Sequence, residues 1–243
     1  MLEPYATKPK QINMLGWKGN LITSMNAHDS ACKYPGSFYW DFHRANLHRC
    51  LYDRAVELGA VVQTNSRVID VVTGIGKQGE KAKAVLEDGR EIEGDLVVGA
   101  DGINSKLREV MLGKEDPPTP TGDLAYRLLL STKEMMKDPE LRVFVEDPQV
   151  NYWLGPDAHA GKFDVCEVTA MGVRLCADER FEVNYVLRGG ELFNMVLLVP
   201  DDMPAGATTL AGSVDEMRAL YKDWDPKHVP PIPLLIHESK SSY

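Results

Sequence analysis

The sequence lacks the features that mark membrane, secreted and metal-binding proteins. No apolar run approaches the roughly 20 residues that a membrane-spanning helix needs. The segment Met1–Lys10 lacks the apolar core of a signal peptide. The 4 cysteines contain no Cys-x-x-Cys pair, and neither they nor His43 and His48 have convincing metal-ligand spacing. We therefore expect a cytoplasmic protein with reduced cysteines and no bound metal.

Basic residues are also too few for a nucleic-acid-binding protein. The chain has 27 Lys and Arg against 36 Asp and Glu, which gives a formal net charge of −9. Phosphate affinity comes from clustered Lys and Arg, so this balance argues against a nucleic-acid partner. With 243 residues, 44% of them hydrophobic, the chain can form one large domain or two small ones around a sizeable core. The proline-rich stretch 116–122 is the best candidate boundary.

Hydrophobic spacing predicts an α/β or α+β fold. The strongest helix is expected over 44–58, with Asp41 as its N-cap and Gly59 just past its end. A capping-box match at Ser213 predicts a second clear helix, over 214–224. Shorter elements are expected as strands and, at 104–112, as a helix; the expected strands are 60–63, 67–72, 83–86, 90–93, 95–101, 123–130, 141–145, 152–154, 185–187 and 193–199. Asp88-Gly89, between 83–86 and 90–93, predicts a tight turn. Residues 1–40 read as loop-rich, with minor strands such as Asn20-Leu-Ile-Thr23. The tail 229–243 has no readable period, so we expect it to be irregular.

The segment Gly74-Ile-Gly76-Lys-Gln-Gly79 formally matches the Gly-x-Gly-x-x-Gly pattern of dinucleotide-binding proteins. That pattern requires a helix to begin at the glycines, so that its N-terminus can hold the pyrophosphate. Only a few residues separate Gly79 from the next predicted strand. We therefore interpret the segment as a hairpin loop.

The most informative stretch is Asp95-Leu-Val-Val-Gly-Ala-Asp101-Gly102-Ile-Asn-Ser105-Lys-Leu-Arg108. It predicts a buried strand, an acidic residue at its carboxyl end, a glycine turn and the start of a helix. Ligands of open α/β sheets bind outside the carboxyl ends of strands, and Gly102 would let a ligand approach the backbone. Asp101 could therefore bind a ribose hydroxyl, or it could cap the helix; the spacing leaves both interpretations open.

This Asp-x-x-x-Gly-Ala-Asp-Gly-x-x-Ser-x-x-Arg stretch resembles the second nucleotide-binding signature of flavin-dependent aromatic hydroxylases, the group that includes para-hydroxybenzoate hydroxylase. The segment Phe42–Ala60 is similar to the helix that precedes this signature in salicylate hydroxylase-like monooxygenases. Further motifs follow in that subgroup's order: Ala125-Tyr-Arg127, Trp153-x-Gly-Pro-x-x-His159, Tyr185-x-Leu-Arg-Gly-Gly190 and Pro200-Asp-Asp202.

The resemblance implies a partial FAD/NAD(P)-binding Rossmann-like domain over 1–118 and a partial sheet-based substrate domain over 119–228. Such enzymes use FAD, NADH or NADPH, and O₂ to place one oxygen atom on an aromatic, usually phenolic, substrate.

By the same resemblance, Arg44, Asp101 and Gly102 would bind the cofactor. Arg127 and Tyr185 would act on the substrate side, holding and orienting a phenolate or carboxylate. The alternatives are that Arg44 pairs with Asp41 or Asp53, that Arg127 makes a surface pair, and that Tyr185 only packs in a sheet. His159 would be a more distant partner or an exposed loop residue.

The sequence departs from the family pattern in three places. The chain begins after the expected Gly-x-Gly-x-x-Gly unit, its tail has no Gly-Asp segment for FAD, and residues 161–182 have no family counterpart. We therefore expect a truncated chain, with intron-derived sequence at 161–182, that binds FAD weakly or not at all. Stoichiometric yellow cofactor on the purified protein would contradict that expectation.

Two other functions remain open at this point. The chain could be a cofactor-free remnant that acts as an interaction module. It could also be a flavin-dependent oxidoreductase of related fold that does not hydroxylate, because fold resemblance alone does not fix the reaction.

Overall fold

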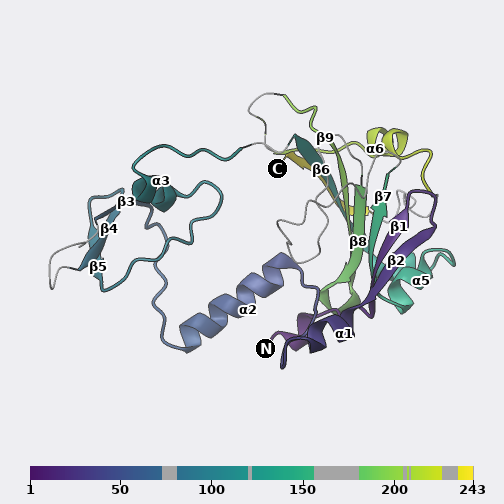
Figure 1. Ribbon diagram of the computed structural model, residues 1–243, viewed down its shortest axis with the longest axis horizontal. Helices are drawn as coiled ribbons and strands as arrows, with labels where there is room; N and C mark the ends of the chain where they lie inside the picture. The colour runs from purple at the N-terminus through teal and green to yellow at the C-terminus, as the bar shows by residue number, and fades with distance from the viewer. Residues whose placement is uncertain are drawn as a thin grey trace. The chain divides into compact units, whose positions relative to one another are not determined.

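The computed structural model describes residues 1–72, 81–119, 122–155, 181–204, 207, 209–225 and 235–242, and of residues 30, 181 and 235–242 it describes the backbone alone (Figure 1). The glycine segment 74–79 and His159 lie outside this part of the chain, as does the unmatched stretch 161–182 apart from its last two residues. None of the helices in the described residues has the length and apolar character needed to cross a membrane.

The chain divides into two compact units. The sheet unit comprises Met1–Asp53 and Pro120–Tyr243, and the small unit comprises Arg54–Thr119. One border falls inside the expected proline-rich stretch. Residues 1–53, which we expected in the cofactor domain, belong to the sheet unit because one of their strands pairs in parallel with a strand of the second half.

The sheet unit is built on an eight-stranded sheet in the order β10-β11-β6-β9-β8-β7-β1-β2 (Figure 1). Its strands are β1 Gln11–Gly16, β2 Leu21–Asn26, β6 Asp123–Ser131, β7 Val150–Leu154, β8 Phe181–Leu187, β9 Leu192–Pro200, β10 Thr209–Leu210 and β11 Leu235–Ser242. Neighbouring strands are antiparallel except β1 and β7, which are parallel. The prediction of a mixed α/β fold is therefore confirmed, and four of the predicted strands lie in this sheet.

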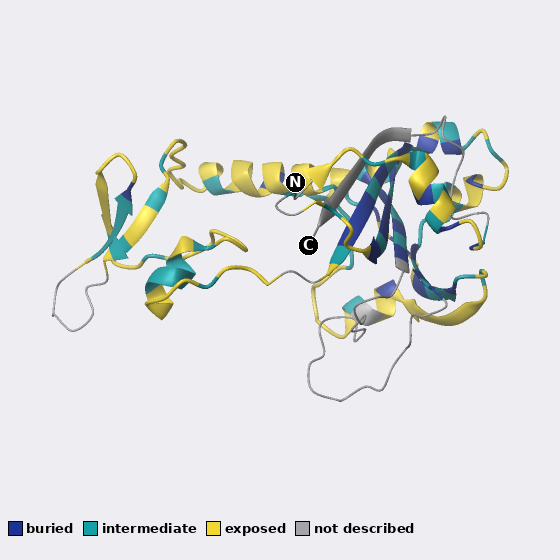
Figure 2. Cartoon of the chain, turned by 90° about the horizontal axis from the view of Figure 1, so that it is seen from above, coloured by how far each residue is buried: buried dark blue, intermediate teal, exposed yellow. Residues whose placement is uncertain are grey.

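One face of this sheet, the core face, holds the hydrophobic core. Alternate residues of β6 and β9 point into it, as the period-two pattern of a strand requires. Three short helices contribute to the core: α4 (Thr132–Met135), α5 (Arg142–Glu146) and α6 (Val214–Leu220). The buried side chains of this core include Leu124, Tyr126, Leu128, Leu130, Phe193, Met195, Leu197, Met217, Tyr221 and Trp224. Figure 2 shows the resulting dark-blue stripes along the sheet.

A line of buried polar side chains crosses the same core face. Asn13 of β1 donates to Asn151 of β7 at 2.9 Å, and Asn151 donates to Asn184 of β8 at 3.0 Å. Asn184 in turn donates to the fully buried Glu182 at 2.6 Å. We call these four residues the amide ladder. Because β1, β7 and β8 can form this chain of bonds in one register only, the ladder fixes how the three strands are aligned.

The small unit contains a three-stranded meander and one helix. Its elements are β3 Val68–Val72, β4 Ala82–Leu86, β5 Glu91–Gly94 and α3 Lys106–Leu112. The expected tight turn at Asp88-Gly89 joins β4 to β5, and Gly89 has the positive φ of 84° that such a turn requires. These strands and α3 are confirmed in type and place.

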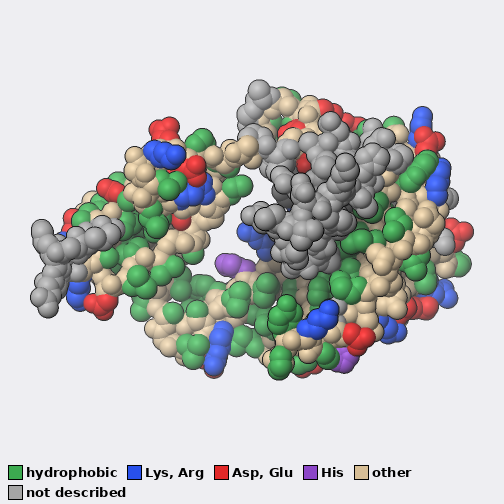
Figure 3. All heavy atoms as spheres, in the orientation of Figure 1, with side chains coloured by type: hydrophobic (Ala, Val, Ile, Leu, Met, Phe, Trp, Pro, Cys, Tyr) green, Lys and Arg blue, Asp and Glu red, His purple; other side chains and the backbone are tan. Residues whose placement is uncertain are grey.

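The expected buried strand at 95–101 is not formed. Leu96 and Val98 are 77% and 73% exposed, and no strand in the described residues pairs with this segment. Such a strand needs a neighbour on each side to accept its backbone hydrogen bonds, so the apolar run alone does not suffice. In Figure 3 hydrophobic side chains lie on the surface of this unit.

Four other sequence predictions are wrong. Residues 60–63 form no strand, and 141–145 lie largely in α5, where the Asp138 carbonyl receives the Arg142 N–H and starts the turn. Residues 235–242 are not irregular but form β11 against β6, a long-range pairing that their sequence does not signal. Residues 11–26 form the antiparallel pair β1–β2 rather than a loop-rich region, although the minor strand expected at 20–23 is confirmed within β2.

The helix predicted over 44–58 is confirmed as α2, Arg44–Glu57, but Asp41 is not its cap. His43 Nδ1 accepts the Ala45 N–H at 3.3 Å instead. Asp41 lies two residues before His43, in an isolated antiparallel bridge with Thr7. At the other end, the Gly59 and Ala60 N–H groups close the helix on the Val56 and Ala55 carbonyls, so the predicted C-terminal glycine is confirmed.

Ser213 caps α6, since its Oγ accepts the Glu216 N–H at 3.3 Å. Replacing Ser213 by Ala should lower the free energy of unfolding by about 1 kcal/mol, because that N–H loses its partner. Urea unfolding followed by tryptophan fluorescence would measure the loss. Ser213→Thr keeps the hydroxyl and serves as the control; an equal loss in both variants would contradict the capping role.

Candidate functional site

Arg127 and Tyr185, the two residues expected on the substrate side, lie on the face of the sheet opposite the core. Tyr185 of β8 pairs directly with Asn194 of β9, and Arg127 of β6 pairs with Val196, two residues further along β9. Directly opposed residues point to the same face of a sheet, and so do residues two apart. Arg127, Asn194 and Tyr185 therefore share one face, and Tyr152 of β7 joins them through its pairing with Val183. We call these four residues the polar face.

The electrostatics of Arg127 and Tyr185 show that the two side chains interact. Partial burial lowers the pKa of the Arg127 guanidinium, and Tyr185 opposes that shift. Burial and the nearby Asp41 raise the pKa of the Tyr185 hydroxyl, whereas Arg127 lowers it. Tyr185 thus interacts with both a cation and a carboxyl group.

Asn194 was not identified from the sequence. Its Nδ2 is buried, and none of the described residues accepts a hydrogen bond from it. A buried donor without a partner is costly and rare, which marks Asn194 as a group that a ligand could satisfy. The available signal was a single amide within the otherwise apolar run of β9, Leu192–Pro200.

A second set of polar groups adjoins Tyr185. Tyr39 and Tyr152 pack with Tyr185 and Val183 against the small cluster formed by Ile12, Ala27 and Val150. Burial and then Tyr185 and Asp41 raise the pKa of Tyr152 to about 12. Burial also raises the pKa of Asp41, to about 7, with no cation acting on it. Perturbed titratable groups gathered in one place are typical of functional sites.

Arg44, expected to bind the cofactor, is the first residue of the 14-residue helix α2 and is exposed. It pairs with neither alternative partner, because Asp53 bonds to Arg49 at 2.9 Å and Asp41 accepts no side-chain donor in the described residues. At the same turn, Asn46 accepts a hydrogen bond from Arg188, which follows β8. This bond ties the first turn of α2 to the strand that carries Tyr185. The N-terminus of a helix carries partial positive charge, so the helix end and the exposed Arg44 guanidinium together favour a bound anion.

Asp101 caps α3 within the small unit. Its Oδ1 accepts from Ser105 Oγ at 2.6 Å, and its Oδ2 accepts from the backbone N–H groups of Lys106 and Leu107. These bonds, with that of Ser105 first, lower the pKa of Asp101 to about 2. The geometry therefore matches the capping interpretation, and little acceptor capacity is left for a ribose hydroxyl. Gly102 has a φ of +77° and no atom within 4 Å of the place a Cβ would take, so its surroundings are open to a ligand.

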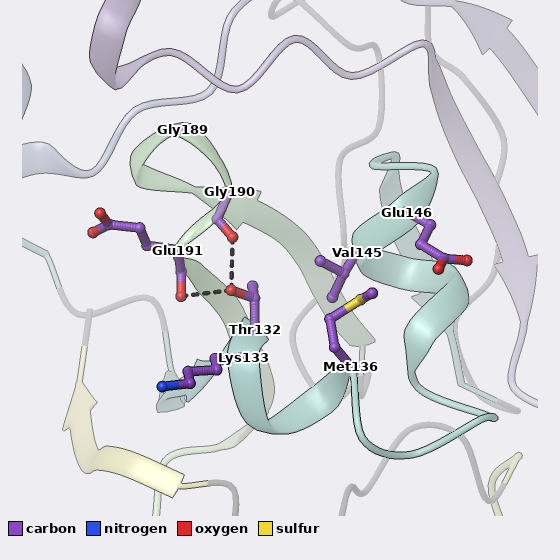
Figure 4. A pocket seen from close by; sticks show the side chains of 8 residues that line it. All are labelled: Thr132, Lys133, Met136, Val145, Glu146, Gly189, Gly190 and Glu191. Atoms are coloured by element: carbon purple, nitrogen blue, oxygen red, sulfur yellow. Dashed lines mark hydrogen bonds between the residues drawn. The ribbon is translucent and has the colours of Figure 1, made fainter.

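One hollow in the described residues lies elsewhere in the sheet unit (Figure 4). It has a volume of 550 Å³ and is lined by α4, α5 and the turn after β8. Figure 4 shows that the Thr132 hydroxyl, the polar group at its centre, is already bonded to the Gly190 and Glu191 carbonyls, at 2.6 and 2.8 Å. None of the five site residues expected from the sequence lines it. The described residues also contain no group of three or more side chains arranged to hold a metal.

Comparison with known proteins identifies the family. Residues 7–184 match the family described as FAD binding domain. The chain is 35% identical over 222 residues to "FAD-dependent monooxygenase OpS4" of Beauveria bassiana, covering 83% of this chain and 45% of that protein. It is 29% identical over 189 residues to "3-hydroxybenzoate 6-hydroxylase 1" of Aquipseudomonas alcaligenes, covering 77% and 40%. The chain thus spans less than half the length of these two relatives.

Solved structures support the fold. The crystal structure of CtdE in complex with FAD and a substrate superimposes with a TM-score of 0.71 at 18% identity, covering 99% of this chain and 53% of that one. A salicylate hydroxylase substrate complex gives a TM-score of 0.67 at 15% identity, covering 98% and 54%. The resemblance inferred from the motifs is therefore confirmed: this chain belongs to the FAD binding domain family, and its fold is similar to that of salicylate hydroxylase.

Proposed function

We propose that this chain acts in the NADH- or NADPH-dependent hydroxylation of an aromatic acid or phenol by O₂, in the cytoplasm. The observation that carries the proposal is the polar face of the sheet unit, where Arg127 and Tyr185 interact beside the unpartnered Asn194 amide. A guanidinium binds a carboxylate or phenolate with two parallel hydrogen bonds, and a phenol next to it can orient the same ligand. Membership of the monooxygenase family supports oxygen transfer as the reaction.

FAD is the cofactor of the family, and when bound it would supply the oxygen-transfer chemistry. Arg44 fits the pyrophosphate of FAD, because its guanidinium is exposed and makes no ion pair in the described residues. Gly102 fits a close backbone approach, because the space beside it is open. Asp101 would contribute by holding the Gly102 turn and the start of α3 in place.

On the substrate side, three of the four residues of the polar face have separate tasks. Arg127 would bind the anionic substituent of the ring, and burial strengthens that pairing because less water competes. Tyr185 would hydrogen-bond the substrate and fix which ring carbon faces the cofactor. Asn194 Nδ2 would donate a further bond that no described residue accepts.

Turnover with 3-hydroxybenzoate as the probe tests the proposal. With FAD supplied in excess, we expect consumption of NADH or NADPH and of O₂ that depends on the aromatic acid, with a hydroxylated product. Arg127→Gln should raise the KM for 3-hydroxybenzoate roughly 10- to 100-fold, because one charge-assisted pair is lost. The control is Lys222→Gln, which removes an exposed positive charge after α6 and should leave KM unchanged. An unchanged KM in Arg127→Gln would contradict the assignment.

A further inference from the structure

Thr7 and Asp41 form a backbone-paired bridge, and Asp41 interacts electrostatically with Tyr39, Tyr152 and Tyr185. Their backbones exchange two hydrogen bonds, Thr7 N–H to Asp41 O at 3.0 Å and Asp41 N–H to Thr7 O at 2.9 Å. In an antiparallel bridge of this kind the two side chains point to the same side. The Thr7 hydroxyl and the Asp41 carboxyl are therefore held next to each other by the backbone.

Both side chains carry a buried polar atom with no partner. Thr7 is only 6% exposed, and neither its Oγ1 nor Asp41 Oδ2 has a hydrogen-bond partner within the described part of the chain. Buried polar groups are nearly always hydrogen-bonded, so two adjacent exceptions call for a ligand group that satisfies both. A hydroxyl group does so, because it can donate to Asp41 Oδ2 and accept from Thr7 Oγ1 at once.

The groups around Asp41 determine what kind of hydroxyl compound fits. Tyr39 from its own segment, Tyr152 from β7 and Tyr185 from β8 all interact electrostatically with Asp41, and none of them is a cation. A ligand carboxylate would therefore be repelled here. The cation that interacts with Tyr185 is Arg127 of β6, and in the sheet order β8 lies between β6 and β7. The three tyrosine rings supply flat apolar surface between the two ends.

We propose that Thr7 and Asp41 form a subsite that binds a ring hydroxyl of the substrate, and that this subsite and Arg127 together select hydroxylated aromatic acids and orient them along the polar face. The inference rests on the proposed function, since it assumes that Arg127 binds the acid group. It adds the two residues that would recognise the ring hydroxyl and the direction in which the ring lies: acid group toward β6, hydroxyl toward the Thr7–Asp41 bridge.

Equilibrium binding of two probes, 3-hydroxybenzoate and benzoate, tests the proposal on the whole chain without added flavin. At pH 8, where the Asp41 carboxyl is ionised, we expect the hydroxylated acid to bind roughly 10- to 100-fold more tightly in the unmodified protein, since one hydrogen bond involves a charged group. Thr7→Val is nearly isosteric and removes one hydrogen-bonding group, and Asp41→Asn removes the charge but keeps an acceptor oxygen; each should lower the ratio of the two dissociation constants several-fold while leaving benzoate binding unchanged. Arg127→Gln should weaken both acids and keep their ratio. Circular dichroism would show that each variant is folded.

The outcomes separate this inference from the function on which it rests. The subsite is overturned if the ratio of dissociation constants stays high in both Thr7→Val and Asp41→Asn, or if it is already 1 in the unmodified protein. In that case, weaker binding of both acids to Arg127→Gln would still support the acid-binding role of Arg127. Acids that bind equally well with and without Arg127 overturn the acid-binding role of the polar face. Failure of both acids to bind overturns both.

Discussion

Replacing Asp41 by Asn should stabilise the protein at pH 8 by about 4 kcal/mol and leave its stability at pH 4 nearly unchanged. The reason is the pKa of Asp41, which burial raises from its usual 3.8 to about 7 in the folded chain. A shift of about three units corresponds to about 4 kcal/mol at 1.36 kcal/mol per unit. Asn has nearly the same shape but cannot ionise, so it avoids the cost.

The sign follows from proton binding. Below pH 4 both the folded and the unfolded chain hold the Asp41 proton, so the group has no effect on stability. Between pH 4 and pH 7 the unfolded chain releases this proton and the folded chain keeps it, so the free energy of unfolding falls as the pH rises. Above pH 7 the folded carboxyl is ionised too, and the loss is complete.

Urea unfolding of both proteins at several pH values between 4 and 8 measures this difference. Other titrating groups contribute equally to both proteins, so the comparison isolates Asp41. The control is Glu140→Gln, an exposed carboxyl whose replacement should change stability by less than about 0.5 kcal/mol at either pH. A constant offset between Asp41→Asn and the unmodified protein at all pH values would show that Asp41 is not held in a raised-pKa state.

The amide ladder should show the second-largest effect. Replacing Asn151 by Ala should lower the free energy of unfolding by about 3 kcal/mol, because Asn184 then loses its donor and Asn13 one of its acceptors, both in buried positions. Urea unfolding at pH 7 would measure the loss. The exposed amide Asn104 makes no side-chain hydrogen bond in the described residues, so Asn104→Ala is the control and should cost less than about 0.5 kcal/mol.

A double-mutant cycle of Asn151→Ala and Asn184→Ala tests whether the ladder acts as one unit. The combined loss should be smaller than the sum of the single losses, because the second substitution removes a group that the first has already left unpaired. Simple additivity would contradict the ladder. The result bears on function as well, because Asn151 and Asn184 each precede a tyrosine, Tyr152 and Tyr185, that lies on the opposite face of the sheet.

Elements whose signals are local could be predicted from the sequence. Such elements depend on residues that lie close together in the sequence. They include the helix α2 with its Gly59 terminus, the Asp88-Gly89 turn and the Ser213 cap. The segment 95–101 has an equally clear apolar pattern, yet it forms no strand, because strand formation depends on neighbours that a local pattern does not specify. The strand β11 shows the converse, since its pairing with β6 supplies what its own sequence lacks.

The same distinction explains the site. Arg127 and Tyr185 were identified because motifs resembling a known family contain them, and the register of β6, β9 and β8 brings them to one face. Thr7 and Asn194 belong to no such motif. Their importance follows from the folded backbone, which pairs Thr7 with Asp41 and Asn194 with Tyr185. In these positions a side-chain atom of Thr7 and one of Asn194 are buried without a hydrogen-bond partner in the described residues. Burial and hydrogen-bond satisfaction are properties of the folded chain and cannot be counted from the sequence.

The central claim is that this chain takes part in the FAD-dependent hydroxylation of an aromatic acid, and the fate of labelled oxygen tests it most directly. The protein would be incubated with excess FAD, NADH or NADPH, and 3-hydroxybenzoate under ¹⁸O₂, and the aromatic products analysed by mass spectrometry. We expect a product that carries one ¹⁸O atom on the ring and, at substrate concentrations below the KM, forms much more slowly in Arg127→Gln. Oxidation of NADH or NADPH without labelled aromatic product, or no turnover with any added flavin, would contradict the claim.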